Sequence, residues 1–226
     1  IQLIREGRFA EAYELNRRDN PFPSICGRVC EHPCEDRCQR KQMDAPLAIR
    51  ELKRYCADRA LADGSAKRPP QKMLDPVDRK VAVVGAGPSG LTAASFLARL
   101  GYKVTVYEAA PKPGGMLRYG IPRYRLPGDV LDREIDDIAG LGVDIRCGVR
   151  VGDGGEGAPT LDSLLREYDA VYLAVGAQKD KRLGLEGEDM PGVLPGLKLL
   201  ADINGDADVE LGRTVLIIGG GNVAVD

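Results

Sequence analysis

The sequence has no long apolar run, little net charge and no secretion signal, and these absences narrow the classes of protein that it can encode. No stretch approaches the roughly 18–20 apolar residues of a membrane-spanning helix. Its 226 residues carry a formal net charge of -2, with basic and acidic side chains interspersed, so nucleic acid is not an expected ligand. We therefore expect a cytoplasmic protein with no membrane and no nucleic-acid partner.

An initiator methionine is also lacking. The sequence begins at Ile1 inside an expected helix and ends at Asp226, just after a glycine-rich turn that would open another helix. Both ends are therefore expected to be cut from a longer chain, and this stretch alone is expected to be inactive.

Helical periodicity dominates the first part of the chain. Apolar residues at helical spacing predict one helix over residues 3–16 and another over residues 47–63. Residues 64–79 are polar and proline-rich, a composition typical of a linker. We therefore predict an all-α domain over residues 1–63, followed by this linker.

From residue 80 onward, short β-branched runs alternate with helical patterns. The expected strands are 80–84, 103–107, 143–147, 169–175 and 213–218, and the expected helices are 89–100, 129–141 and 160–167. Such alternation predicts a parallel sheet covered by helices, which is an α/β fold.

A glycine-rich motif follows the first of these strands. Its sequence is Gly85-Ala86-Gly87-Pro88-Ser89-Gly90, and a helical pattern comes directly after it. The first glycine permits a tight turn, the second lets backbone approach a pyrophosphate, and the third lets the helix pack on the strand. The next strand delivers Glu108, whose carboxylate can accept hydrogen bonds from a ribose diol. Three glycines can also form a mere turn, but strand, helix and acid in this order favour dinucleotide binding.

A second motif of this kind closes the sequence. The apolar run Val215-Leu216-Ile217-Ile218 leads into Gly219-Gly220-Gly221-Asn222-Val223-Ala224. Two such units suit an enzyme that binds two dinucleotides at once, although an ordinary strand-to-helix turn is the alternative. The residue that would select NADH or NADPH is expected past Asp226, so this sequence does not decide between the two.

Four of the six cysteines lie close together, at Cys26, Cys30, Cys34 and Cys38. Gly27 and Pro33 interrupt this stretch, so the cysteines are expected on turns and short helical pieces. A chain without a secretion signal is not expected to form disulfides, which leaves a metal site or a redox centre. The spacing matches neither structural zinc nor bacterial ferredoxins, and alone it does not identify the metal. Cys56 and Cys147 are expected to be packing residues.

These motifs together resemble a known family of flavoproteins. With Tyr107-Glu108-Ala109, Gly114-Gly115-Met116-Leu117-Arg118-Tyr119-Gly120-Ile121-Pro122 and Tyr124-Arg125-Leu126-Pro127, the chain resembles the small subunit of glutamate synthase and the flavin half of dihydropyrimidine dehydrogenase. The resemblance implies that FAD contacts Gly85, Ala86, Gly87, Pro88, Ser89, Gly90, Glu108, Ala109, Gly114, Gly115, Met116, Arg125 and Val151. It implies that NAD(P)H contacts Gly220, Gly221, Asn222 and Val223.

The resemblance extends to the cysteine stretch. It implies an iron–sulfur domain in which two [4Fe-4S] clusters are shared with cysteines upstream of this sequence. Cys30, Cys34 and Cys38 match cluster ligands, whereas Cys26 matches a position that is usually not a ligand. The chain departs from these relatives in a shorter spacing between Cys30 and Cys34, and in Lys53, where some offer Gln or Glu. Zinc or plain buried thiols are the alternatives.

The implied fold is a small all-α iron–sulfur domain followed by an α/β Rossmann-like FAD/NAD(P)-binding domain. The FAD-binding domain is expected at residues 80–212, and an NAD(P)-binding domain is expected to start at 213–226. The implied activity is hydride transfer from NAD(P)H to FAD, then passage of single electrons through clusters to a partner subunit. That partner would be like the glutamate synthase large subunit, or another iron–sulfur or ferredoxin-linked subunit. No side chain need act as acid or base for the hydride transfer itself, so binding residues and cluster ligands are named and the catalytic residues stay unknown.

Two rival functions stay open. A thioredoxin-reductase-like flavoenzyme shares two nucleotide folds, but the sequence contains no C-x-x-C pair. A non-catalytic docking or assembly subunit would keep the nucleotide fold for structure alone.

Overall fold

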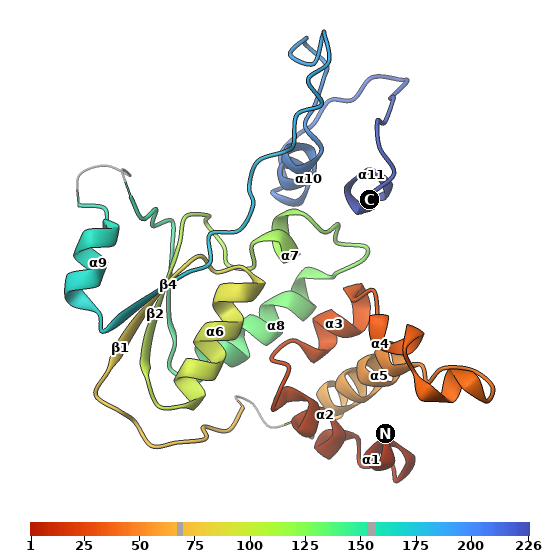
Figure 1. Ribbon diagram of the computed structural model, residues 1–226, viewed down its shortest axis with the longest axis vertical. Helices are drawn as coiled ribbons and strands as arrows, with labels where there is room; N and C mark the ends of the chain where they lie inside the picture. Colours follow the sequence, from red (N-terminus) through yellow and green to blue (C-terminus); the bar gives the residue numbers. More distant parts are fainter. Residues whose placement is uncertain (67–69, 153–156) are drawn as a thin grey trace.

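A helical region and a parallel sheet form the body of the protein. The computed structural model in Figure 1 describes residues 1–66, 70–152 and 157–226. Residues 67–69 of the expected linker lie outside the described residues, and the predicted domain limits stay predictions. The helical region contains α1 (Gln2–Arg5), α2 (Phe9–Arg17), α3 (Pro23–Val29), α4 (Pro33–Asp36), the 3₁₀ helix η1 (Gln39–Gln42) and α5 (Ile49–Ala62).

The single helix predicted over residues 3–16 is wrong, because two helices form there. Gly7 has a φ of +73°, in the left-handed region that ends a helix, and separates α1 from α2. The helix predicted over 47–63 is confirmed as α5. It packs against α2 around the buried side chains of Tyr13, Ala57 and Ala60. The cysteine stretch between them folds as short helical pieces, as expected.

In the described part of the chain, the sheet contains four parallel strands in the order β3-β2-β1-β4. Its strands are β1 (Lys80–Val84), β2 (Lys103–Glu108), β3 (Asp144–Cys147) and β4 (Ala170–Leu173). The remaining helices are α6 (Pro88–Arg99), α7 (Met116–Tyr119), α8 (Gly128–Ala139), α9 (Leu161–Glu167), α10 (Gly196–Asn204) and α11 (Asn222–Val225).

Helices cover both faces of this sheet. On one face, Val83 and Val106 pack with α6 and α8 (Figure 1). On the other face, Ala82 and Val84 pack with Leu164 of α9. Val83 points to one face and Ala82 and Val84 to the other because successive side chains of a strand alternate between its two faces. A parallel sheet with helices on both faces confirms the expected α/β fold.

The strand predicted over residues 213–218 is wrong. The structure has no strand there among its described residues, and Leu216 is 86% exposed. The apolar, β-branched composition favours a strand, but a parallel strand also needs backbone partners on a neighbouring strand. The run instead follows α10 as extended chain away from the sheet (Figure 1).

The helical region docks on the α6 and α8 face of the sheet. Phe22 and Ile25 belong to the same apolar cluster as Leu131 and Ile135 of α8. Beside them, both carboxylate oxygens of Glu134 accept backbone N–H groups, from Ser24 at 2.7 Å and from Ile25 at 3.2 Å. These are N–H groups of the first turn of α3, which have no partner within their own helix. Glu134 is 1% exposed.

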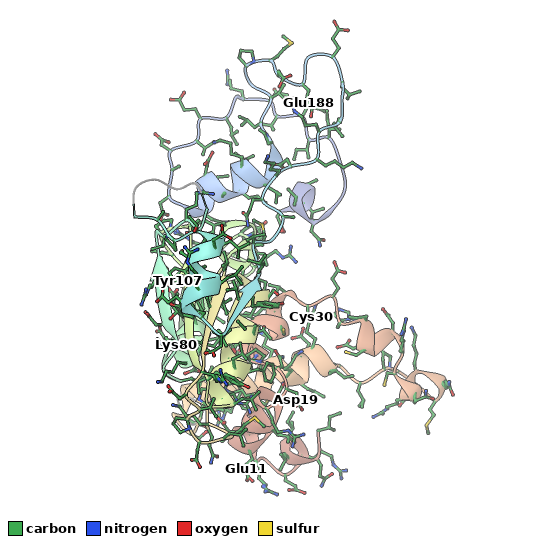
Figure 2. The ribbon with its side chains drawn as sticks, turned by 60° about the vertical axis from the view of Figure 1, so that its left-hand side comes forward. Glu11, Asp19, Cys30, Lys80, Tyr107 and Glu188 are labelled. Atoms are coloured by element: carbon green, nitrogen blue, oxygen red, sulfur yellow. The ribbon has the colours of Figure 1, made fainter. Side chains whose placement is uncertain are left out.

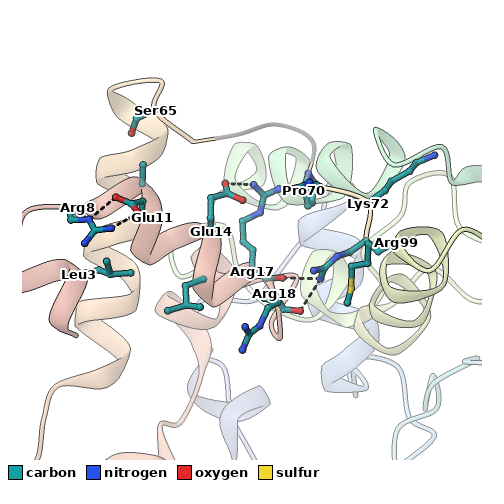
Figure 3. A pocket seen from close by; sticks show the side chains of 14 residues that line it. Leu3, Arg8, Glu11, Glu14, Arg17, Arg18, Ser65, Pro70, Lys72 and Arg99 are labelled. Atoms are coloured by element: carbon teal, nitrogen blue, oxygen red, sulfur yellow. Dashed lines mark hydrogen bonds and ion pairs between the residues drawn. The ribbon is translucent and has the colours of Figure 1, made fainter. Parts of the chain in front are cut away.

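Charged side chains surround this contact. The guanidinium of Arg17 pairs with Asp137 at 3.0 Å, and both side chains are buried. Arg99 donates to the backbone oxygens of Arg17 and Arg18 at the end of α2 (Figure 3). A cleft of about 840 Å³ borders these groups, between α2 and residues 70–73. None of the predicted binding residues lines this cleft.

Burial of Glu134 makes stability depend on pH. Burial raises the pKa of Glu134 from 4.5 to about 7, against the opposing effect of the N–H groups of Ser24 and Ile25. Between these two values the unfolded protein binds fewer protons than the folded one, so stability falls as pH rises. Between pH 5.5 and pH 7.5, the free energy of unfolding measured with urea should fall by about 2 kcal/mol more in the wild type than in Glu134→Gln. A constant difference between the two proteins would contradict this prediction.

Candidate dinucleotide site and cysteine segment

The first glycine loop links β1 to α6 at the carboxyl edge of the sheet. Gly85 has a φ of +107°, and its N–H donates to the backbone oxygen of Tyr107 at 2.8 Å. A Cβ on Gly85 would lie 2.3 Å from the oxygen of Ala174, the residue that follows β4. A Cβ on Gly90 would lie 1.9 Å from the oxygen of Gly85. Only glycine fits at these two positions without a shift of backbone.

A second pair of glycines lies on this loop. Gly114 donates its N–H to the oxygen of Ala86 at 2.8 Å. A Cβ on Gly115, which has a φ of +53°, would lie 2.7 Å from the Cα of Gly87. The structure therefore brings the 114–115 pair against the 85–90 loop, although 24 or more residues separate them along the chain.

Glu108 connects the two parts of this site. Its carboxylate accepts the N–H of Ala86 at 2.7 Å and that of Ala110 at 2.8 Å, one on each oxygen. A carboxylate offers about four lone-pair positions, so two stay open to a ribose diol. The half-buried side chain fits the role expected for it in dinucleotide binding.

The N-terminus of α6 faces the same edge. Gly87 is the N-cap residue and Pro88 is the first helical residue, and no side chain among the described residues caps this end. Its first-turn N–H groups, together with the positive end of the helix dipole, suit a pyrophosphate. Ser89 Oγ lies 3.0 Å from the hydroxyl of Tyr172 on β4. The backbone of this loop therefore fits FAD or another dinucleotide.

Three predicted FAD contacts lie around this core. Met116 begins α7, directly after the second glycine pair. Val151 packs against the apolar cluster that contains Val84 and Tyr107. Arg125 is turned toward Asp226, and its Nη1 lies 2.5 and 2.7 Å from the two carboxylate oxygens. The guanidinium of Arg125 is therefore paired with the carboxylate of Asp226.

The second glycine motif keeps its turn without its strand. Gly219 has a φ of +130°, and α11 begins with Asn222 after Gly221. The side-chain amide of Asn222 donates to Glu31 at 3.1 Å, beside Cys30. Predicted NAD(P)H contacts thus lie on a turn and a helix start, but not at the edge of a sheet.

The cysteine segment presents sulfur atoms to backbone N–H groups. Cys30 Sγ accepts the N–H of His32 at 3.3 Å, and Cys38 Sγ accepts that of Leu47 at 3.5 Å. The hydrogen bond from Leu47 is the main reason why the pKa of Cys38 lies below its usual value. Burial raises the pKa of Cys26. Hydrogen-bonded thiolates are the usual ligands of iron–sulfur clusters, so the donors at Cys30 and Cys38 fit such a group.

A site for a single metal ion does not form in this segment. Within residues 1–66, 70–152 and 157–226, no three His, Cys, Asp or Glu side chains are arranged to hold one ion. Cys34 is exposed, and Cys56 is buried on α5 as expected for a packing residue. In Figure 2, Cys30 and Tyr107 both lie above Asp19 and Glu11, and Tyr107 is near the carboxyl end of β2.

Some contacts of this site could not be read from local motifs. Tyr172 lies beside Ser89 only because β4 pairs with β1, and nothing local marks it. Glu134 did carry a signal, since it is an acid on the apolar face between Leu131 and Ile138.

No helix of the described chain is long and apolar enough to cross a bilayer.

A parallel sheet whose first strand leads into this glycine loop, with an acid ending the second strand, defines a Rossmann-type dinucleotide-binding protein. The chain belongs to the pyridine nucleotide-disulphide oxidoreductase family, which it matches over residues 49–151 and 79–226. Residues 1–65 match the family described as dihydropyrimidine dehydrogenase domain II, 4Fe-4S cluster. These matches confirm the fold class, the family resemblance, and FAD, NAD(P)H and a [4Fe-4S] cluster as cofactors.

Individual relatives agree with this family. The chain is 43% identical to the NADP(+)-dependent formate dehydrogenase subunit beta of Moorella thermoacetica and 37% identical to the glutamate synthase [NADPH] small chain of Halomonas elongata. All of this chain is covered, but only 34% and 49% of those proteins. The chain therefore spans about a third to about half of the length of the curated relatives that it matches.

One solved structure is similar to part of this chain. Mycobacterium tuberculosis FprA in complex with NADPH is 29% identical, with a TM-score of 0.50. The match covers 57% of this chain and 29% of FprA.

Proposed function

We propose that the chain is part of an NAD(P)H-dependent FAD iron–sulfur oxidoreductase. In such an enzyme a hydride would pass from NAD(P)H to FAD with uptake of one proton, and the reduced flavin would then release two protons and give up its two electrons singly through [4Fe-4S] clusters to a partner subunit. Flavin suits this role because it exchanges electrons in pairs and singly. The observation that carries the proposal is the assembly of Gly85, Gly115 and Glu108 at one sheet edge, beside a docked cysteine segment.

Each part of the chain then has a defined role. The 85–90 loop and the start of α6 bind the FAD pyrophosphate, Glu108 binds its adenosine ribose, and the 114–116 segment lies along the rest of the molecule. Ala109, Arg125 and Val151 complete this site. The second glycine motif binds NAD(P)H through residues 220–223, and the sulfur atoms of Cys30, Cys34 and Cys38 bind a cluster.

The partner subunit and the location in the cytoplasm belong to the same proposal. Several relatives are named as subunits or chains of larger enzymes, among them a formate dehydrogenase and a glutamate synthase. A subunit of this kind supplies electrons to a reaction carried out elsewhere in its complex.

Reconstitution of the complete protein tests this proposal. The protein would be prepared anaerobically with FAD, iron and sulfide, and then titrated with NADPH and, separately, with NADH. We expect the flavin absorbance to bleach, followed by loss of the visible iron–sulfur absorbance. Flavin that neither nucleotide bleaches would favour the docking subunit, and a protein that stays colourless would exclude the proposed function.

Glu108→Gln is expected to weaken FAD binding by about 10- to 100-fold, because charge-assisted hydrogen bonds are worth about 1.5–3 kcal/mol. The amide keeps one acceptor oxygen and points an N–H group at a backbone donor, so the contact to Ala86 or Ala110 is lost. Titration of the apoprotein with FAD, followed by flavin fluorescence, measures the change. Glu210→Gln, at an exposed carboxylate, is the matched control. Equal affinity in both variants would remove Glu108 from the site.

Cys30→Ser is expected to lower iron and acid-labile sulfide by the content of one cluster, because a hydroxyl is a poor substitute for a thiolate ligand. Cys34→Ser and Cys38→Ser should do the same. Cys26→Ser should retain both contents, since Cys26 is partly buried with its Sγ 3.7 Å from Asn20 Oδ1, and burial raises its pKa. Iron and sulfide analysis of the anaerobically prepared protein measures the cluster content of each variant. Loss of a cluster in Cys26→Ser alone would reverse the assignment.

A further inference from the structure

One buried carboxylate joins the cysteine segment to the sheet domain. Glu134 lies on α8 and is 1% exposed. Its oxygens accept the N–H groups of Ser24 and Ile25, which are the second and third residues of α3. Cys30 is the residue that ends this helix. The carboxylate therefore holds the short helix that leads directly into the proposed cluster ligand.

The same face of α8 supports the proposed flavin site. Leu131 lies three residues before Glu134, so both side chains project from one face of the helix. A Cβ on Gly114 would lie 3.2 Å from Leu131 Cδ2, which shows that this side chain backs the second glycine pair. Arg118, four residues after Gly114, also pairs with Asp132 of α8. One helix thus contacts the flavin-binding loop and the cysteine segment at neighbouring positions.

The hydrogen bonds of Glu134 have a fixed direction, whereas apolar packing does not. Phe22 and Ile25 pack on α8 as well, but such contacts tolerate small shifts of one surface over another. Two oxygens that match two adjacent N–H groups permit only one placement of α3. A buried charge contributes little net stability compared with apolar side chains of similar volume, so the role that this contact supports is positioning.

We propose that Glu134 is a positioning residue for electron transfer, which sets the placement of the Cys30 segment relative to the flavin-binding loop. The inference rests on the proposed function. Arg17, Asp137 and Arg99 hold the preceding helix to α6 and α8 and serve the same docking. Removal of the carboxylate is expected to leave hydride transfer to flavin intact and to slow only the exit of electrons from it.

Hydrogen exchange of the intact holoprotein gives a readout that does not depend on activity. At pH 8, where Glu134 is ionised, the amides of Ser24 and Ile25 should exchange much more slowly than Ala10 and Glu11, the corresponding first-turn positions of the uncapped helix α2. In Glu134→Gln this protection should fall by about tenfold or more, as expected when a hydrogen bond to a charged group is lost. Unchanged protection in the variant would overturn the contact.

Stopped-flow absorbance with NADPH separates the two electron-transfer steps. In Glu134→Gln, reduction of flavin should stay within about twofold of wild type, and reoxidation of flavin by the clusters should slow by about tenfold or more, since a misplacement of about 1 Å can cost 100-fold in rate. Asp136→Asn, at an exposed position of the same helix, should match wild type in both steps. Equal reoxidation rates, with iron content unchanged, would overturn the proposal.

A variant that keeps the carboxylate covers the case in which Glu134→Gln does not fold. Glu134→Asp withdraws the oxygens by one methylene group and should give the same slow second step. A normal second step in Glu134→Asp with lost protection at Ser24 and Ile25 would refute the positioning role. If NADPH fails to reduce flavin even in the wild type, the proposed function fails, whereas the exchange data still decide whether Glu134 holds α3.

Discussion

Gly85→Ala is expected to abolish FAD binding and to lower the free energy of unfolding by about 3–5 kcal/mol. Two costs add at this position. A φ of +107° is strained for any residue with a Cβ, and that Cβ would lie 2.3 Å from the oxygen of Ala174. Ala174 cannot move freely, because its N–H donates to Val84 at 2.8 Å where β1 and β4 pair. Urea unfolding and the flavin content of the purified protein measure the two effects.

Two other glycines separate the strain from the collision. Gly142 has a φ of +94° with open space around its missing Cβ, so Gly142→Ala should cost only about 1–2 kcal/mol of backbone strain. Gly128 starts α8 without a positive φ and with nothing within 4 Å, so Gly128→Ala should change stability by less than about 1 kcal/mol. Both controls should retain FAD. If Gly85→Ala resembled Gly142→Ala in stability and flavin content, the loop would not depend on close approach to β4.

The first glycine loop could be predicted because its requirements are local. Residues 85–90 join a strand to the helix that follows it, and the glycines are demanded by a turn of a few residues. Glu108 could also be predicted from the sequence, since it ends the next strand along the chain. The contact of Gly115 with Gly87 could not be predicted from local sequence, because it depends on how the chain returns to the sheet edge. Only the family resemblance indicated that Gly114 and Gly115 belong to the site.

The errors have the same origin. Periodicity over residues 3–16 continues through Gly7, and only the left-handed backbone there divides the helix. The run at 215–218 has the composition of a buried strand, but its ladder depends on partners that composition does not specify. Glu134 was not predicted from the sequence, because its partner Ser24 lies 110 residues away along the chain.

Arg17→Ala is expected to lower the free energy of unfolding by about 3–5 kcal/mol, because it removes the guanidinium from a buried ion pair with Asp137. The guanidinium lies 3.0 Å from Asp137 and 3.0 Å from Glu14, and the side chains of Arg17 and Asp137 are 3% and 6% exposed. The helical region should loosen from α8 as a result. Urea unfolding monitored by circular dichroism measures the loss, and proteolysis should show faster cleavage between α2 and α3.

Arg18→Ala is the matched control for this prediction. Arg18 is the next residue, its side chain is 64% exposed, and it pairs with Asp19 at 3.5 Å, so its removal should change stability by less than about 1 kcal/mol. Its backbone oxygen still accepts Arg99 in the variant. In the double variant Arg17→Ala with Asp137→Ala, the loss should be smaller than the sum of the two single losses, because both single substitutions remove the same ion-pair contact. Additive losses would mean that the two side chains stabilise the docked helices independently, and that the ion pair does not hold the cysteine segment to α8.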